Sequence, residues 1–174
     1  MKSCSRLSKW RGSMSGISKF SCILKTPEET LAIAAGLAGL CEIGDCILLY
    51  GDVGVGKTTF ARGFIQAVAK TQEEIVSPTF TLVQTYPLKS GGMVWHCDLY
   101  RLKNKNELFE LGLDDAFDSG IILVEWPELA AEQMPQDSLS VRMDISGQGR
   151  SIIITGNADV WKSRIEKLVM WENT

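Results

Sequence analysis

Residues 51–58, GDVGVGKT, have the types and the spacing of a loop that binds the phosphates of a nucleotide. They fit the pattern G-x-x-x-x-G-K-[ST] in full, between an apolar stretch and a stretch with helical spacing. Glycines let the backbone N–H groups turn inward towards phosphate oxygens, and the following helix adds its positive N-terminal end. The phosphate contacts predicted for this loop are those of Gly51, Asp52, Val53, Gly54, Val55 and Gly56.

Three side chains directly after the loop complete this chemistry. Lys57 places a positive charge beside the β- and γ-phosphates, and the hydroxyl of Thr58 can join the coordination shell of Mg²⁺. Thr59 offers another hydroxyl near the α-phosphate. A chance glycine-rich turn rarely matches the whole pattern, since glycine makes up only about 7% of residues in proteins. The sequence therefore predicts binding of a nucleoside triphosphate.

Two acids that end apolar stretches could act on the γ-phosphate. Glu125 ends IILVE (121–125), and Asp98 follows the alternating stretch 93–97. Ligands of α/β folds collect at the carboxyl edge of the sheet, where a second acid can hold Mg²⁺ or help to orient water. The alternatives are a solvated strand end or helix cap for Glu125, and a turn acid or an ion pair with Arg101 for Asp98.

Other residues near these acids bear on the site and on the identity of the base. His96 is better explained as a strand histidine with satisfied hydrogen bonds than as a catalyst, and Trp126 suits core packing and an aromatic wall equally well. The stretch NKNE (104–107) imitates the guanine-reading motif N-K-x-D, but Glu107 is one methylene longer than aspartate and the stretch begins a helix. The chain also lacks an LSGGQ sequence, which excludes the transporter-type ATPases. ATP is the expected nucleotide by default, because a solvated helix start explains NKNE better than a guanine reader does.

The elements that must position these residues alternate between strands and helices. Thr26 and Asn157 are expected N-caps, and Pro27 occupies the first position of its helix. We expect one α/β domain with the P-loop NTPase fold, in three layers with a central mixed sheet between helices. The predicted strands cover 20–24, 46–50, 79–87, 93–100, 121–125, 138–145 and 150–156, and the predicted helices cover 26–40, 58–70, 104–112 and 157–171.

The composition is that of an ordinary globular domain. The chain has 174 residues, of which 45% are hydrophobic and 22% are charged. No apolar run approaches the roughly 20 residues that cross a bilayer, so we expect a soluble, cytoplasmic protein without membrane partners. The five cysteines are scattered and form no C-x-x-C pair, which favours thiols over disulfides or a zinc site.

Charge is distributed unevenly along the chain. Residues 1–20 carry five basic side chains and no acid, whereas residues 21–174 carry 13 basic and 21 acidic side chains, a net charge of −8. An acidic body argues against strong direct binding of nucleic-acid phosphates. We expect residues 1–20 to form a disordered, dispensable extension and residues 21–174 to form the ATPase domain. The alternatives for the extension are a transit peptide, or a segment upstream of a true start at Met14.

Five blocks of the sequence resemble, in this order, the TsaE (YjeE) family, the bacterial P-loop ATPases of tRNA threonylcarbamoyladenosine synthesis. The blocks are GDVGVGKTTFARG, SPTFTLVQTY, HCDLYRL, ELGLDDAF and LVEWPE, and the resemblance runs from about residue 26 to residue 155. The departures are mild. Cys97 stands where an aromatic residue is usual, and Val53 and Val55 stand in a loop that often has leucine and alanine. Neither departure replaces a side chain that has a polar role in the family.

The resemblance implies an ATPase that is weak alone and serves a larger machine. It would act with the TsaB–TsaD pair to form the threonylcarbamoyl group on the adenosine beside the anticodon, and it would meet tRNA only through these partners. We expect a monomer in their absence. The alternatives are a small-molecule P-loop kinase, which would need an acceptor pocket and a lid with mobile arginines, and a nucleotide-gated binding module that never hydrolyses ATP.

The resemblance also implies roles for single residues. Lys57 and the loop amides would hold the phosphates, Thr58 and Glu125 would hold Mg²⁺, and Lys57 and Asp98 would act in hydrolysis. Other residues are implied to lie near the nucleotide. Ser77 and Thr79 would lie near the γ-phosphate in a switch-like segment (77–81), Trp126 would lie close to the nucleotide, and Thr26 and Arg150 would lie on the adenine side.

Overall fold

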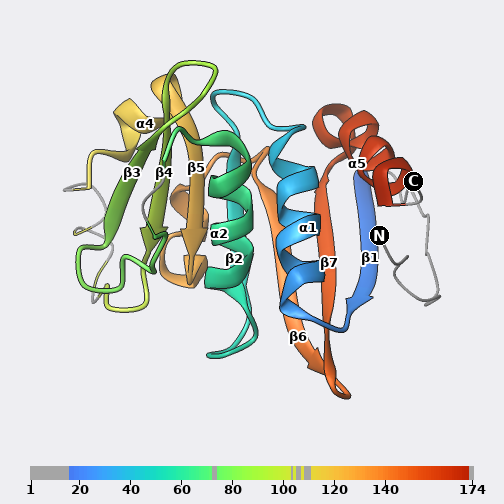
Figure 1. Ribbon diagram of the computed structural model, residues 1–174. Coiled ribbons are helices and arrows are strands. Elements are labelled where there is room, and N and C mark those ends of the chain that lie inside the picture. Colours follow the sequence, from blue (N-terminus) through green and yellow to red (C-terminus); the bar gives the residue numbers. More distant parts are fainter. Residues whose placement is uncertain (1–15, 72–73, 103, 105–106, 108–110, 173–174) are drawn as a thin grey trace.

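A seven-stranded mixed β-sheet runs through the centre of the protein (Figure 1). The computed structural model describes residues 16–71, 74–102, 104, 107 and 111–172. The strand order is β1-β7-β6-β2-β5-β4-β3. The strands are β1 (Ile17–Leu24), β2 (Cys46–Tyr50), β3 (Val83–Pro87), β4 (Met93–Asp98), β5 (Gly120–Glu125), β6 (Leu139–Ser146) and β7 (Gly149–Asn157).

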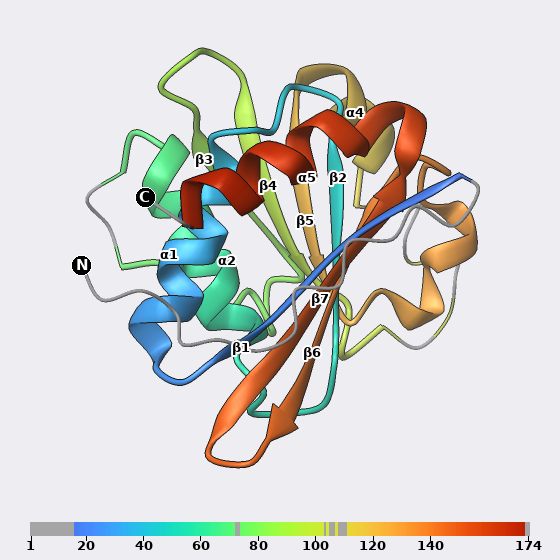
Figure 2. The same cartoon turned by 90° about the vertical axis from the view of Figure 1, so that its right-hand side faces the viewer.

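Helices cover both faces of this sheet, which confirms the predicted three-layer α/β architecture (Figures 1 and 2). One face carries α1 (Pro27–Ala38), α2 (Lys57–Val68) and α5 (Ala158–Glu172), and the other carries α4 (Leu113–Ser119) and the short 3₁₀ turns η1 (Pro127–Leu129) and η2 (Ala131–Gln133). Each face has its own hydrophobic core, the larger one under α1, α2 and α5. No helix in the described ranges is long and apolar enough to span a membrane.

The centre of the sheet is parallel and determines where the polar strand ends meet. β2 pairs in parallel with both β5 and β6, and β5 pairs in parallel with β4. The carboxyl ends of these strands lie at the lower edge of the sheet in Figure 1, where α2 begins. The register places Asp98 beside Glu125, and Glu125 beside Leu49. Leu49 belongs to the larger core, on the α2 side of the sheet. Both acids therefore face that side, because side chains in register on neighbouring strands share a face.

The predicted helix caps are confirmed. Thr26 is the N-cap of α1, where its Oγ1 accepts a hydrogen bond of 3.3 Å from the backbone N–H of Glu29. The backbone N–H of Asp159 donates to Asn157 Oδ1 over 3.0 Å at the start of α5. Capping satisfies N–H groups that have no partner inside a helix. These short-range signals therefore locate both helices correctly.

Two strands begin three or four residues away from their predicted starts, and β4 ends at Asp98 rather than at residue 100. β1 begins at Ile17 rather than residue 20, because Ile17–Phe20 pair with Ile154–Asn157 of β7. The prediction that a strand covers 79–82 was wrong, because the chain turns there: Leu82 has a φ of +64°, and its N–H donates to the carbonyl of Pro78. Most of the helix predicted over 104–112 lies outside the described residues. None of the cysteines in the described ranges is in a disulfide.

Candidate nucleotide site

The loop between β2 and α2 takes a shape that requires glycine. Gly51, Gly54 and Gly56 have φ values of +133°, +79° and +111°, a region that L-residues with side chains rarely occupy. A Cβ on Gly51 would also collide with the backbone oxygen of Met143 on β6, whereas one on Gly54 would meet open space. Close approach of the loop to β6 therefore makes Gly51 the most constrained position.

Lys57 lies buried at the start of α2, under the loop. Its Nζ donates to the carbonyl oxygens of Gly51 and Asp52 over 2.6 and 2.9 Å. The same atom lies 3.7 Å from the centroid of the Trp126 ring, a cation–π contact. Burial lowers the pKa of Lys57, and nearby carboxylates, with Glu125 the strongest, oppose this shift. The ammonium group therefore sits in a partly desolvated position where it can meet an anion.

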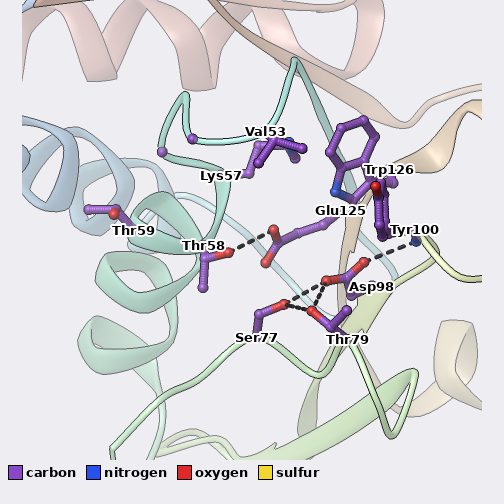
Figure 3. A pocket seen from close by; sticks show the side chains of 12 residues that line it. Val53, Lys57, Thr58, Thr59, Ser77, Thr79, Asp98, Tyr100, Glu125 and Trp126 are labelled. Atoms are coloured by element: carbon purple, nitrogen blue, oxygen red, sulfur yellow. Dashed lines mark hydrogen bonds between the residues drawn. The ribbon is translucent and has the colours of Figure 1, made fainter.

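Glu125 joins the end of β5 to the start of α2. The side chain is 2% exposed, so this acid is not the solvated strand end that was the alternative. Its Oε2 accepts a hydrogen bond of 2.9 Å from Thr58 Oγ1 (Figure 3). Its Oε1 lies 2.8 Å from Nε2 of His96, which is completely buried. The sequence did not reveal this histidine–glutamate contact, because it depends on the register between two strands.

Asp98 ties the segment before β3 to the end of β4. The carboxylate is 3% exposed. Its Oδ2 accepts from Ser77 Oγ over 2.5 Å and from Thr79 Oγ1 over 2.8 Å, and its Oδ1 accepts from the backbone N–H of Tyr100 over 3.0 Å (Figure 3). Arg101, the alternative partner, instead lies over the ring of Phe80, 4.3 Å from its centroid.

These side chains surround one hollow of about 460 Å³. Trp126, whose φ of +57° turns it away from the line of β5, forms part of the wall with Tyr100, at a centroid separation of 4.9 Å. The sequence missed Tyr100, although it stands two residues after Asp98 in a block of the family resemblance. The residues that line the hollow are Val53, Gly54, Gly56, Lys57, Thr58, Thr59, Ser77, Thr79, Asp98, Tyr100, Glu125 and Trp126 (Figure 3).

A second hollow of about 320 Å³ lies on the other side of the same loop. It shares Gly54, Gly56 and Thr59 with the first hollow, and it brings together Thr26 and Arg150, which are far apart in sequence. The guanidinium of Arg150 donates through Nε to the carbonyl of Val55 over 3.1 Å and through Nη2 to that of Gly54 over 3.3 Å. Arg150 therefore supports the loop from β7. Two predicted contacts, Gly51 and Asp52, line neither hollow.

The oxygen atoms of Thr58 and Glu125 suit a magnesium ion that arrives with phosphates. Mg²⁺ prefers oxygen ligands and is usually held by one or two protein groups together with phosphates and water. In the part of the chain that the structure describes, no group of three or more His, Cys, Asp or Glu side chains could form a metal cage of its own. The donor set therefore fits a metal bound jointly with a nucleotide.

Comparisons with known proteins show which family and which fold this chain resembles. The family model "Threonylcarbamoyl adenosine biosynthesis protein TsaE" matches residues 24–152. The chain is similar to two proteins named tRNA threonylcarbamoyladenosine biosynthesis protein TsaE. The one from Rickettsia bellii is 39% identical over 71% of this chain and 85% of its own length, and the one from Bacillus subtilis is 38% identical over 84% and 92%. The crystal structure of YdiB from Bacillus subtilis superposes with a TM-score of 0.76 at 30% identity, covering 91% of this chain and 99% of that one.

Proposed function

Because this chain belongs to the TsaE family of tRNA threonylcarbamoyladenosine biosynthesis proteins, we propose that it is the subunit that binds and hydrolyses ATP in that pathway. It acts with the TsaB–TsaD pair to form the threonylcarbamoyl group on the adenosine beside the anticodon. One observation carries the proposal. Lys57, Thr58, Asp98 and Glu125 converge on a single hollow beside a glycine loop.

Binding begins at the loop. Backbone N–H groups of residues 51–56 donate to phosphate oxygens, and the ammonium of Lys57 exchanges its carbonyl acceptors for the β- and γ-phosphates. Thr58 and Glu125 would hold Mg²⁺, which neutralises phosphate charge when bound. The second hollow suits the adenine and ribose, because Thr26 and Arg150 line it directly beside the loop.

Hydrolysis then depends on Asp98. This carboxylate orients a water molecule whose oxygen forms a bond to the γ-phosphorus while the bond to the bridging oxygen breaks, so that ATP and water become ADP and phosphate. Ser77 and Thr79 occupy the Oδ2 atom of Asp98. Oδ1 accepts one hydrogen bond, from Tyr100, so this oxygen keeps a second acceptor position that can hold the water. Ser77 and Thr79 fix the orientation of the carboxylate, so movement of segment 77–81 would reorient Asp98 and thereby links hydrolysis to that segment.

The acidic body of the chain supports a role beside protein partners. Residues 21–174 carry a net charge of −8, which disfavours direct binding of tRNA phosphates. The protein would reach tRNA only through TsaB–TsaD, and segment 77–81 would report the state of the nucleotide to them. A small-molecule kinase and a binding module without hydrolysis remain the alternatives that an experiment must separate.

Phosphate release from ATP, measured with and without TsaB–TsaD and tRNA, tests the proposal. We expect slow release by the protein alone and faster release with the partners. Asp98→Asn and Glu125→Gln should each lower the stimulated rate at least about tenfold, whereas Asp144→Asn, at an exposed acid on β6, should not.

Three results would contradict the proposal. If TsaB–TsaD and tRNA do not stimulate phosphate release, the protein does not act as an ATPase subunit beside that pair. Unchanged phosphate release in both Asp98→Asn and Glu125→Gln excludes the mechanism. Transfer of the phosphoryl group to a metabolite, in a mixture of acceptor molecules, identifies a kinase instead.

A further inference from the structure

His96 is a buried polar residue to which the mechanism above gives no role. It lies on β4, two residues before Asp98 and on the same face of the sheet. Its side chain is 0% exposed, and its Nε2 lies 2.8 Å from Glu125 Oε1. A position without solvent access excludes a direct role with a bound nucleotide. Any role of His96 in the nucleotide site must therefore act through Glu125.

The surroundings of the ring indicate which nitrogen carries the proton. Among the described residues, Nδ1 is buried without a hydrogen-bond partner. Buried N–H groups are nearly always paired, so the tautomer with its hydrogen on Nε2 puts the one N–H of a neutral ring where an acceptor exists. His96 therefore donates from Nε2 to the carboxylate of Glu125.

As a result, the two carboxylate oxygens of Glu125 have different hydrogen-bond partners. Oε1 faces His96 in the interior, and Oε2 faces Thr58 Oγ1 at 2.9 Å beside the hollow. With one oxygen held on each side, the plane of the carboxylate cannot rotate without breaking a bond. Oε2 is thereby presented next to the hydroxyl that would share the metal.

We propose that His96 is a positioning residue that orients Glu125 for the Mg²⁺ that accompanies the nucleotide. The inference rests on the proposed function, because it requires that Glu125 and Thr58 hold that ion. Partners that orient a metal ligand typically contribute 10–100-fold to metal affinity. A residue that only fills the core would instead affect nucleotide binding equally with and without the metal.

Calorimetric titration with the non-hydrolysable ATP analogue AMP-PNP, in Mg²⁺ and in EDTA, separates these roles. His96→Leu keeps the bulk but removes the donor, and we expect it to weaken binding in Mg²⁺ by 10–100-fold and in EDTA by less than about twofold. His96→Gln can place an amide N–H near the same position and should recover most of the loss. Val94→Ala is the matched control, since Val94 is equally buried on the same face of β4.

Nuclear magnetic resonance gives a readout that is independent of binding. His96 is the single histidine of the chain, so ¹⁵N-labelled histidine yields one imidazole spin system. We expect the pattern of the Nε2–H tautomer, and a shift of its signals when AMP-PNP is added with Mg²⁺ that is larger than the shift in EDTA. The opposite tautomer, with the hydrogen on Nδ1, would overturn the proposal.

The binding data can overturn it in two more ways. His96→Leu that shows the same Mg²⁺ dependence as the wild type excludes a positioning role, and so does His96→Gln that loses as much as His96→Leu. Thermal denaturation of both variants and of Val94→Ala identifies a general loss of folding. A wild-type protein that binds no nucleotide in either medium contradicts the proposed function itself, which distinguishes that failure from the failure of this inference.

Discussion

At the scale of single residues, Lys57 shows how a motif and its surroundings combine. The motif alone predicted a cation at this position, since the pattern of loop residues is local in sequence. The contacts of the ammonium with two carbonyl oxygens and with the Trp126 ring could not be predicted, because Trp126 reaches it from β5. The partner of His96 and the position of Tyr100 in the wall of the hollow could not be predicted either, because these contacts also join residues that are distant in sequence.

Lys57→Met should separate binding from folding. Loss of charge-assisted hydrogen bonds, worth roughly 1.5–3 kcal/mol each, should weaken ATP binding about 100-fold. The free energy of unfolding should change by less than about 1 kcal/mol, because removal of a partly desolvated charge offsets the lost hydrogen bonds. Calorimetry and thermal denaturation measure the two quantities. Lys162→Met, at an exposed position on α5, should change neither.

The same lysine predicts a pH dependence. Burial lowers the pKa of Lys57 below 10.5 in the folded protein, so the unfolded chain holds this proton more tightly. Stability rises with pH where the unfolded state binds more protons. The wild type should therefore gain stability relative to Lys57→Met as the pH rises from the lowered pKa to 10.5. Urea denaturation at several pH values measures the difference, and a wild type that loses stability relative to the variant over this window contradicts the prediction.

At the scale of elements, the sequence located the starts of α1 and α5 through their caps, but it did not predict α4. Caps such as Thr26 and Asn157 act on neighbours within three residues, so their signals are local. The start of β3 was misplaced because the alternating residues 79–82 look extended, yet Asp98 holds Ser77 and Thr79 in a turn. Long-range hydrogen bonds thus overrode a local strand signal.

The loop between β2 and α2 allows a paired substitution. Gly51→Ala introduces a side chain at a φ of +133° and against the backbone of β6, and should destabilise the fold by more than about 3 kcal/mol. Gly54→Ala introduces only the strain of a φ of +79° in open space, and should cost about 1 kcal/mol. Chemical denaturation compares them, and equal losses would show that approach to β6 is unimportant.

Segment 77–81, together with the turn that it forms with Leu82, should become more mobile when its hydrogen bonds to Asp98 are removed. The double variant Ser77→Ala with Thr79→Val deletes two hydrogen bonds to the carboxylate of Asp98, worth roughly 1.5–3 kcal/mol each. We expect faster hydrogen exchange at the amide of Leu82, which bonds to Pro78, and a lower partner-stimulated ATPase rate. Ser138→Ala removes a hydroxyl from a turn before β6 and is the control. Unchanged exchange at Leu82 would show that Asp98 does not hold the segment.

At the scale of the whole molecule, the class of fold could be predicted and the order of its strands could not. A phosphate-binding loop between a strand and a helix, together with further alternating elements, indicates a three-layer α/β domain. The order of the strands depends on pairings between distant segments, such as β1 with β7 near the two ends of the chain. Periodicity within a segment carries no information about such partners.

The pairing of β1 with β7 predicts how far the chain can be shortened. Deletion of residues 1–15 leaves β1 whole and should keep the free energy of unfolding within about 0.5 kcal/mol. Deletion of residues 1–20 removes half of β1, including Phe20, which is 3% exposed in the core, and should cost at least about 3 kcal/mol. Urea denaturation of both proteins measures the difference. Equal stability would place the start of the folded domain after residue 20.

The register between β4 and β5 has a consequence for how related chains can differ in length. Asp98 and Glu125 stand side by side through backbone hydrogen bonds, whatever the identities of most other residues in the two strands. An insertion outside the two strands leaves this register unchanged. One residue inserted within β5 would move Glu125 past Asp98 and turn it to the opposite face of the sheet. Chains with the same chemistry should therefore tolerate many substitutions in these strands but no change in their length.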